Sequence, residues 1–318
     1  MDILQKEKKL KSLEAQLKNL DDQEANETIL ATIENYKKKA MSSLNGWDRV
    51  LLARHPSRPS TKDYIDHVFD EFIELHGDRY YQDDPAIIGG IAMFNDVPIT
   101  VIGHRKGRTT EENIMYNFGM PHPEGYRKAL RLMKQAETFN RPIITFIDTP
   151  GAYPGLGAEA RGQGEAIARN LYTMSDIGVP ILTIIIGEGG SGGALAIGMG
   201  NQVFMLENSI YSILSPEGYA SILWKDANRA KEAAEVMKLT SYDLKEMGVI
   251  EGIIKEPLGG AHQDPAFVYA SVQSLITDFL QQYHQRSNYE IRTERYTKYR
   301  NIGFFQRFNY DNLKGVIK

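Results

Sequence analysis

The residues of this chain that could do chemistry are, first of all, glycines. Thirteen of its twenty-eight glycines lie between Gly151 and Gly200, and most of these form two loops, at 149–157 and 187–193. Each loop follows an apolar run that begins at a proline. Glycine adds no reactive side chain, but it permits positive φ and close backbone approach. Two such loops at the ends of buried strands therefore predict a site whose working groups are backbone N–H donors, suited to holding an oxyanion.

The second loop also matches a nucleotide-binding motif. GEGGSG, from Gly187 to Gly192, fits G-x-G-x-x-G, and Glu207 follows twenty residues after Gly187, as in a dinucleotide-binding unit. However, only residues 193–201 separate the motif from the next predicted strand. This leaves too little room for a Rossmann helix and its return loop, which argues against a dinucleotide site.

The same loop matches a hydrolase motif as well. GGSGG, from Gly189 to Gly193, fits G-x-S-x-G and would make Ser191 a nucleophile. In hydrolases with this motif an acid and a histidine follow the serine along the chain. The downstream histidines are His262 and His284, and both lie beyond the last predicted core strand. The sequence therefore favours Ser191 as a small residue that the turn accepts.

A third interpretation treats the loop as a pair of donors. Gly192 and Gly193 would stand at the start of a short helix that begins at Ala194, with Gly190 just before them. Their N–H groups would point outward, aided by the helix dipole, and could hold an enolate or ureido oxyanion without any side chain. The alternative is structural, with glycines placed where a helix and a strand cross closely.

The elements that must position these loops alternate between strand and helix. Apolar runs at 86–94 and 97–103 flank Asn95 and Asp96 and predict a β-hairpin. Residues 1–45 predict a polar helical hairpin with a leucine seam, and 47–59 a connection. Further strands are predicted at 143–148, 181–186, 203–206, 211–214 and 249–254, and helices at 61–75, 123–139, 162–174, 193–198, 216–223, 229–237 and within 263–318. This alternation predicts an α/β fold with a largely parallel sheet.

The composition excludes several classes of function. The chain has 42% hydrophobic residues, a net charge of −4, a pI near 6.0 and no cysteine. Disulfides, thiolate catalysis and cysteine-ligated zinc are therefore excluded within it, and no general attraction to nucleic acid is indicated. The charged N-terminus lacks a signal core, and no apolar run approaches the ~18 residues of a membrane span. We therefore expect a cytoplasmic protein without a membrane segment. For the basic, aromatic tail after Gln281 we expect a packing or partner surface.

Seven segments closely resemble a known family. They lie between about Trp47 and His262 and read ARHPSRP, GMPHPEGYRKALRLM, RPIITFIDTPGAYPG, EARGQGEAIARNL, IGEGGSGGALAIG, SPEGYASILWKD and EPLGGAH. The family is that of the α subunits of bacterial acetyl-CoA carboxylase carboxyltransferase. The resemblance implies a crotonase-like (ClpP/crotonase) α/β fold of repeated ββα units with helical N-terminal and C-terminal extensions. We divide the chain accordingly into a helical hairpin and linker (1–60), a carboxyltransferase core (61–258) and a C-terminal helical extension (259–318).

The same resemblance implies a reaction and partners. The family moves the carboxyl group of carboxybiotin, carried on a biotin carboxyl carrier protein, to acetyl-CoA, and the malonyl-CoA formed enters fatty-acid biosynthesis. The α chain works in an α2β2 heterotetramer with a β subunit that bears a cysteine zinc ribbon, so no metal is expected in this chain. ATP is used only by the separate biotin carboxylase. Two alternatives stay open: a stand-alone crotonase-type acyl-CoA hydratase or isomerase, and a subunit that contributes only structure.

The resemblance also implies roles for the glycine pair. Gly192 and Gly193 would form an oxyanion hole for the biotin ureido oxygen, with Gly190 and Ala194 beside them, while the β subunit would supply the donors for the thioester. A stand-alone hydratase or isomerase would instead want a well-placed carboxylate, and the loop contains only Glu188.

Two further groups complete the expected site. Gly151, Ala152 and Tyr153, in the first glycine loop, would form the opposite wall of the biotin site. Lys106 and Arg108 would orient the migrating carboxylate through charge-assisted hydrogen bonds. Their alternative roles are a solvated turn or a contact with CoA phosphates.

Overall fold

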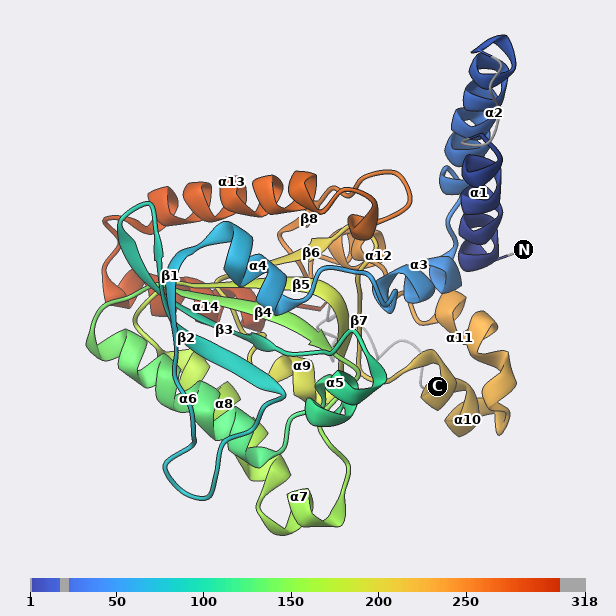
Figure 1. The fold of residues 1–318 in the computed structure, drawn as a ribbon. Coiled ribbons are helices and arrows are strands. Elements are labelled where there is room, and N and C mark those ends of the chain that lie inside the picture. The colour runs from blue at the N-terminus through green and yellow to red at the C-terminus, as the bar shows by residue number, and fades with distance from the viewer. Residues whose placement is uncertain (1, 18–22, 304–318) are drawn as a thin grey trace, which may run out of the picture.

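One mixed β-sheet runs through the centre of the computed structural model, which describes residues 2–17 and 23–303 and gives the backbone alone for residues 13, 14, 16, 17, 23–28, 40 and 41 (Figure 1). The strands are β1 (Asp70–Glu74), β2 (Ile87–Phe94), β3 (Val97–His104), β4 (Ile143–Thr149), β5 (Ile181–Gly190), β6 (Gln202–Leu206), β7 (Ile210–Ser212) and β8 (Gly252–Ile254). Their order is β1-β2-β3-β4-β5-β6-β8, and β7 pairs with β5. The pairs β1–β2 and β2–β3 are antiparallel and the others are parallel, which confirms the predicted sheet.

The strands β2 and β3 form the predicted hairpin. Asn95 and Asp96 have φ values of 47° and 62°, and two positive φ angles in succession are what a type I′ turn requires. The two strands then pair residue by residue from Phe94 with Val97 outward. A local turn signal thus sets the register of this part of the sheet.

Two stretches differ from the sequence prediction. The helix expected over 61–75 ends early as α4 (Thr61–Val68), and the chain continues as the edge strand β1 beside β2. Short apolar runs fit a helix or a strand equally well by periodicity, and pairing with β2 decides here. The connection expected over 47–59 contains α3 (Gly46–Ala53), whose N-cap Asn45 accepts the Asp48 N–H at 2.7 Å.

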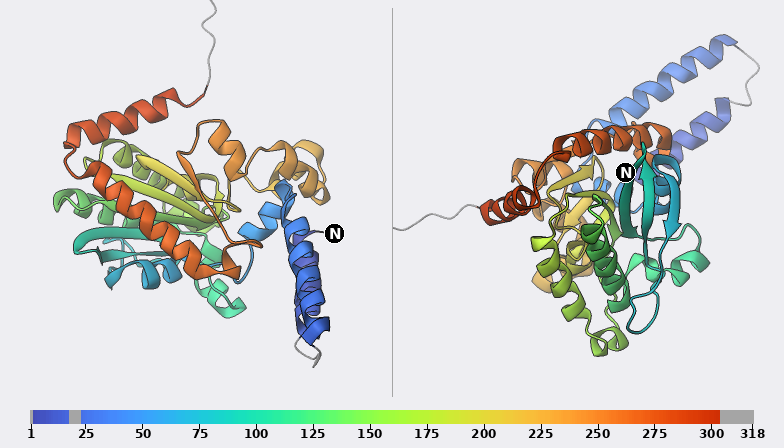
Figure 2. Two further views of the ribbon diagram at one scale, coloured as in Figure 1. Left: turned by 90° about the horizontal axis from the view of Figure 1, so that it is seen from above. Right: turned by 90° about the vertical axis from the view of Figure 1, so that its left-hand side faces the viewer.

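Helices cover both faces of the sheet (Figures 1 and 2). The remaining helices are α1 (Ile3–Leu17), α2 (Gln23–Met41), α5 (Thr110–Met115), α6 (Pro123–Thr138), α7 (Leu156–Ala160), α8 (Gln163–Asp176), α9 (Ser191–Leu195), α10 (Pro216–Trp224), α11 (Ala230–Val236), α12 (Ser241–Glu246), α13 (Pro265–Tyr283) and α14 (Asn288–Asn301). Successive side chains of β4 point to opposite faces. Ile144 and Phe146 pack with α4 and α13, whereas Ile143 and Ile147 pack with α6 and α8. Within residues 2–17 and 23–303, none of these helices has both the length and the apolar character of a membrane span.

The helices α1 and α2 form the predicted N-terminal hairpin, which projects away from the sheet (Figures 1 and 2). Leu10 and Ile33 are buried in it. At its base, the Ile3 N–H donates to Oδ1 of Asp48 at 3.0 Å and so joins the hairpin to α3. The other leucines of the predicted seam lie outside the described residues or side chains (Leu13, Leu17, Leu20).

A buried arginine holds α14 in place. The guanidinium of Arg295 is fully buried and donates to the carbonyls of Met174, Ile177 and Val179 and to Oδ1 of Asn201, at 2.6–3.2 Å. Burial lowers the pKa of Arg295 to about 10, so the group stays charged at neutral pH. The carbonyls lie at and after the C-terminal end of α8, where the helix dipole favours a cation.

Arg295→Met should therefore lower the free energy of unfolding by about 2–3 kcal/mol, since it leaves buried carbonyls without donors. Urea unfolding of the purified chain measures the change. Arg300→Met, at an exposed position of the same helix, is the control and should cost less than about 0.5 kcal/mol. Equal losses in the two variants would contradict the role given to Arg295.

Candidate active site

Strand β5 carries the second glycine loop further than the sequence predicts. The expected strand end is at 186, whereas β5 runs on to Gly190 and is buried throughout. The reason is β7, which pairs in parallel with Glu188, Gly189 and Gly190. The turn begins only at Ser191, which has a left-handed φ of 52° and is the first residue of α9, so that this helix begins three residues before the predicted start at Ala194. A helix of five residues is too short for a Rossmann unit, as the sequence suggests.

The predicted donor pair lies at the start of α9. Gly192 and Gly193 are its second and third residues. The first four N–H groups of a helix have no acceptor within it, so these two stay available as donors. Gly192 is half-buried, whereas Gly193 and Ala194 are buried behind it. The pair is therefore reached from the side of Gly192.

The first glycine loop lies directly against this turn. A Cβ added to Gly190 would come within 2.2 Å of the Pro150 oxygen, and one added to Gly193 within 2.5 Å of the Gly151 carbonyl carbon. Only glycine fits at either position. Thr149 fixes the loop, because its Oγ1 accepts the Gly151 N–H at 3.0 Å and donates to the Gly151 oxygen at 2.8 Å.

A cavity of about 560 Å³, here called the loop cavity, opens where the two glycine loops meet. Gly151, Ala152 and Tyr153 line it on one side, and Ser191 and Gly192 line it on the other. The structure thus brings the predicted wall and one predicted donor together. Other residues around it include Arg54, Glu159, Gln163, Ile167, Ile213 and Glu217.

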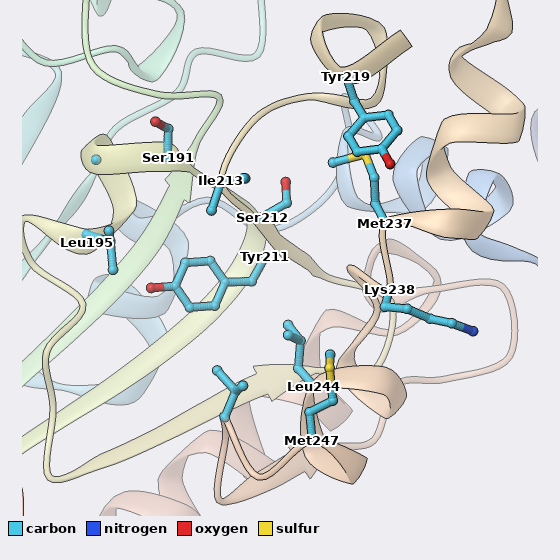
Figure 3. Close-up of a pocket in the computed structure, with 12 residues that line it drawn as sticks. Ser191, Leu195, Tyr211, Ser212, Ile213, Tyr219, Met237, Lys238, Leu244 and Met247 are labelled. Atoms are coloured by element: carbon cyan, nitrogen blue, oxygen red, sulfur yellow. The ribbon is translucent and has the colours of Figure 1, made fainter. Parts of the chain in front are cut away.

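A second cavity, here called the apolar cavity, shares Ser191, Gly192 and Ile213 with the loop cavity and measures about 460 Å³ (Figure 3). Tyr211 of β7 stands in the middle of its lining, and the Lys238 side chain points away from it. Burial raises the pKa of Tyr211 to about 12, so the phenol stays neutral. The remaining lining is mostly apolar and comes from α9 to α12 and the segments between them (Leu195, Ile213, Tyr219, Met237, Leu244, Met247, Val249).

The predicted carboxylate-binding residues lie elsewhere and line neither cavity. Nζ of Lys106 is 2.6 Å from Oδ1 of Asp148, and the same oxygen accepts the Glu188 N–H at 3.0 Å. Arg108 is largely exposed and pairs with Asp63 of α4. In this chain Lys106 therefore contacts the site through Asp148 and β5, and Arg108 holds a helix.

His104, next to these residues, is fully buried. Within the described part of the chain, neither ring nitrogen makes a hydrogen bond of good geometry, but the backbone groups of Gly193 and Phe146 lie close enough to favour its protonated form. Burial lowers the pKa of His104 to about 4; the Asp148 carboxylate opposes this shift and the Lys106 ammonium adds to it. The imidazole is neutral at pH 7.

This depressed pKa predicts a loss of stability in mild acid. Between pH 6.5 and 4 the unfolded chain binds a proton at His104 that the folded chain does not, so the stabilising effect present above pH 6.5 is lost as the pH falls toward 4. The loss should approach about 3 kcal/mol at pH 4. His104→Gln should remove this part of the slope in urea unfolding from pH 7 to 4. If His104→Gln leaves the pH dependence of the unfolding free energy unchanged, His104 takes up its proton equally well in the folded and unfolded chains.

Arg54, which no sequence motif singled out as a functional residue, lines the loop cavity. Its Nη2 lies 2.6 Å from Oε1 of Glu188, and its Nη1 lies 2.8 Å from Oε1 of Glu217. Arg54 stands in ARHPSRP and Glu217 in SPEGYASILWKD, two segments that carry the family resemblance. Their place in these segments was therefore a signal that Arg54 and Glu217 have a role, although nothing in the local sequence showed that the two residues meet.

The serine-hydrolase interpretation finds no support in the arrangement. His262 is 3.2 Å from Glu7 and stacks on His55, and it lines neither of the two cavities that Ser191 borders. His284 follows directly after α13. Within the described residues, Ser191 therefore has no catalytic histidine from either predicted position.

Glu7, His55 and His262 are a group of possible metal ligands among the described residues. Each histidine Nε2 faces one oxygen of Glu7, at 3.3 Å and 3.2 Å. The two rings are stacked 3.8 Å apart with an angle of 10° between them. Ring-nitrogen lone pairs lie in the ring plane, so those of parallel rings do not converge on one ion. The group is better suited to two hydrogen bonds on a shared carboxylate.

Comparison with known proteins gives consistent results. The sequence matches the family described as "Acetyl co-enzyme A carboxylase carboxyltransferase-like" over residues 1–303. It is 54% identical over 305 residues to the "Acetyl-coenzyme A carboxylase carboxyl transferase subunit alpha" of Listeria welshimeri, which covers 92% of this chain and 96% of that protein. The protein of the same name from Staphylococcus aureus is 55% identical over 299 residues, covering 93% and 95% of the two chains.

Solved structures with the same fold are more distant in sequence. Transcarboxylase 12S, with hydrolysed methylmalonyl-coenzyme A bound, matches with a TM-score of 0.60 at 18% identity, over 74% of this chain and 44% of that one. The β subunit of geranyl-CoA carboxylase from P. aeruginosa matches with a TM-score of 0.55 at 14% identity, over 83% and 48%. This chain spans less than half the length of either. The likeness confirms the predicted crotonase-like fold.

Proposed function

The chain belongs to the family of carboxyltransferase α subunits of acetyl-CoA carboxylase, and from this premise we propose that it forms the biotin half of a site that moves a carboxyl group from carboxybiotin to acetyl-CoA. One observation carries the proposal: two glycine turns meet at one cavity and bring the backbone of Gly192 to its wall, with Gly193 directly behind it. We further infer that malonyl-CoA is the product, that the carrier protein and biotin carboxylase are separate chains, and that the protein works in the cytoplasm.

The residues around the loop cavity fit a biotin group. Carboxybiotin, when bound, supplies the carboxyl group and a ureido oxygen on which negative charge develops as that group leaves. The N–H groups of Gly192 and Gly193 would stabilise this charge, each by roughly 3 kcal/mol. Gly151, Ala152 and Tyr153 would face the ring from the other side. The cavity, about 560 Å³, lies within the range of about 300–1,000 Å³ usual for small-molecule sites.

The surroundings support an incomplete site that a partner chain finishes. Leu156, Ile213 and Ile222 are 90%, 79% and 61% exposed. Ile213 lines the loop cavity, and Leu156 and Ile222 lie on α7 and α10, the helices that contribute Glu159 and Glu217 to its lining. Exposed large apolar side chains of this kind mark protein–protein contact. We infer that a β subunit with a zinc ribbon covers this side in an α2β2 assembly and supplies the donors for the acetyl-CoA thioester.

The alternative of a stand-alone hydratase or isomerase needs a free carboxylate at the donors. Glu188, the carboxylate of the donor loop, is buried and bonded to Arg54 at 2.6 Å and 3.1 Å. It is therefore a poor general base for a bound thioester. Of the other carboxylates that line the loop cavity, Glu217 is also paired with Arg54, and Glu159 lies on α7, outside the donor turn. The other alternative, a subunit that contributes only structure, is distinguished from a catalytic subunit by the assay described next.

The test is the reverse reaction, in which the carboxyl group moves from malonyl-CoA to biocytin. The acetyl-CoA that this reaction releases is measured. We would assay the chain alone and then with a matching β subunit. Turnover only in the mixture is the expected result. Turnover by the chain alone would show a complete site in one chain. No turnover by a well-formed complex would favour a structural role or another acyl substrate.

A further inference from the structure

Among residues 2–17 and 23–303, Arg54 is the one arginine in the lining of the loop cavity. It follows α3 directly and serves as the C-cap of that helix, with its N–H donating to the carbonyls of Leu52 and Val50. Val50 and Ala53 are buried against Ile210 of β7 and against residues around α11. The backbone that carries Arg54 is therefore fixed from two sides.

The guanidinium of Arg54 joins two carboxylates from different elements. Its Nε and Nη2 donate to Oε1 of Glu188 at 3.1 Å and 2.6 Å, and its Nη1 donates to Oε1 of Glu217 at 2.8 Å. Although burial alone would lower the pKa of Arg54, these hydrogen bonds and charges raise it above its ordinary value. Exposure of the Arg54 side chain is 29% and that of Glu188 is 7%, so the pair is largely desolvated. Ion pairs of this kind hold geometry more firmly than exposed ones.

The two carboxylates come from β5, which carries the donor turn, and from α10, which contributes residues to both cavities. Glu188 lies two residues before Gly190, where β5 ends and the donor turn begins. The Glu188 N–H donates to Oδ1 of Asp148 at 3.0 Å, which fixes its backbone, and the bond to Arg54 fixes its side-chain carboxylate. Glu217 is in the first turn of α10, whose Tyr219 lines the apolar cavity.

We propose that Arg54 is a positioning residue that sets the donor turn of β5 against α10, so that the N–H groups of Gly192 and Gly193 keep the geometry needed in the transition state. This inference rests on the proposed carboxyltransferase function. Arg54 acts through Glu188 and Glu217 and does not itself bind the migrating carboxylate. Small displacements of catalytic groups are costly, since an error of about 1 Å can reduce a rate on the order of 10²-fold.

Arg54→Met in the complex with the β subunit is the direct test. We expect kcat for the reaction of malonyl-CoA with biocytin to fall roughly 10-fold to 100-fold while the KM for malonyl-CoA stays within about twofold. Arg54→Lys keeps the charge but loses the fork to two carboxylates, so it should recover only part of the rate. Arg169→Met, which breaks an exposed ion pair with Glu165 on α8, is the matched control and should leave kcat unchanged.

A mutant cycle separates positioning from substrate binding. If Arg54 acts through Glu188 and Glu217, adding Arg54→Met to a chain that carries both Glu188→Gln and Glu217→Gln should not slow it further. A rise in the KM for malonyl-CoA with unchanged kcat would make Arg54 a substrate ligand and overturn the inference. So would a fall in the thermal midpoint of the complex with no change in kcat. An inactive wild-type complex would instead count against the proposed function, so the two failures are distinguishable.

Discussion

Gly193→Ala should reduce carboxyl transfer by the complex roughly 10³-fold. The new Cβ would lie 2.5 Å from the Gly151 carbonyl carbon and 2.7 Å from the Ala152 nitrogen, and both are backbone atoms that cannot turn aside. The donor turn and the loop after β4 must therefore separate. Separation moves the N–H groups away from the oxyanion and opens the opposite wall at the same time. The reverse assay with malonyl-CoA and biocytin measures the loss.

Gly192→Ala, the same substitution one residue earlier, is the matched comparison for Gly193→Ala. A Cβ on Gly192 would meet only the side chain of Ile167, at 3.5 Å, which is ordinary contact. Gly192→Ala should therefore cost less than about tenfold, because its N–H group stays in place. Size-exclusion chromatography and the thermal midpoint should show that both variants still assemble with the β subunit. Equal activities of Gly193→Ala and wild type would remove the donor turn from the mechanism.

Local signals explain what the sequence predicts well in this fold. The turn at Asn95 and Asp96 specifies its own hairpin, and the helix predicted over 123–139 is α6 (Pro123–Thr138), with proline at its first position. The errors occur where a distant partner decides. Gly187 to Gly190 have low strand propensity, yet they extend β5 because β7 pairs with them. The domain limits at 60 and 258 stay a prediction.

In the candidate site, too, local sequence signals predict some features, whereas others depend on residues that are distant in the sequence. Glycine spacing is enough to predict both loops, and the structure places Gly151, Ala152, Tyr153 and Gly192 around one cavity. Arg54 lies 134 residues before Glu188 and 163 before Glu217, so no spacing rule could join them. Lys106 shows a different limit of the sequence. Its charge suggested a contact with a carboxylate of the substrate, which stays a prediction, and the structure adds a pair with Asp148 that spacing could not foresee.

Stability of the strand that carries the donor turn also depends on Arg58, a buried arginine close in sequence to Arg54. Its Nε donates to the Ile186 carbonyl of β5 at 2.5 Å, and its Nη1 and Nη2 donate to the two carboxylate oxygens of Glu256 at 3.2 Å and 2.5 Å. Side-chain exposure is 2% for Arg58 and 0% for Glu256. Glu256 also accepts N–H groups from Asn208 and Ala261. The pair therefore ties the segments ARHPSRP and EPLGGAH to the strand that carries the donor turn.

Arg58→Met should lower the free energy of unfolding by about 3–5 kcal/mol, because it leaves the Glu256 carboxylate buried without a counter-charge. Urea unfolding at pH 7 measures this. Arg229→Met, which breaks an exposed pair with Glu232, should cost less than about 1 kcal/mol. Adding Glu256→Gln to Arg58→Met should restore part of the loss, since the uncompensated charge is then gone. Similar losses for Arg58→Met and Arg229→Met, or no restoration in the double variant, would mean that the buried charge is not the cause. The proposed chemistry of the site uses backbone groups, so it would depend on ion pairs such as this one to hold that backbone in place.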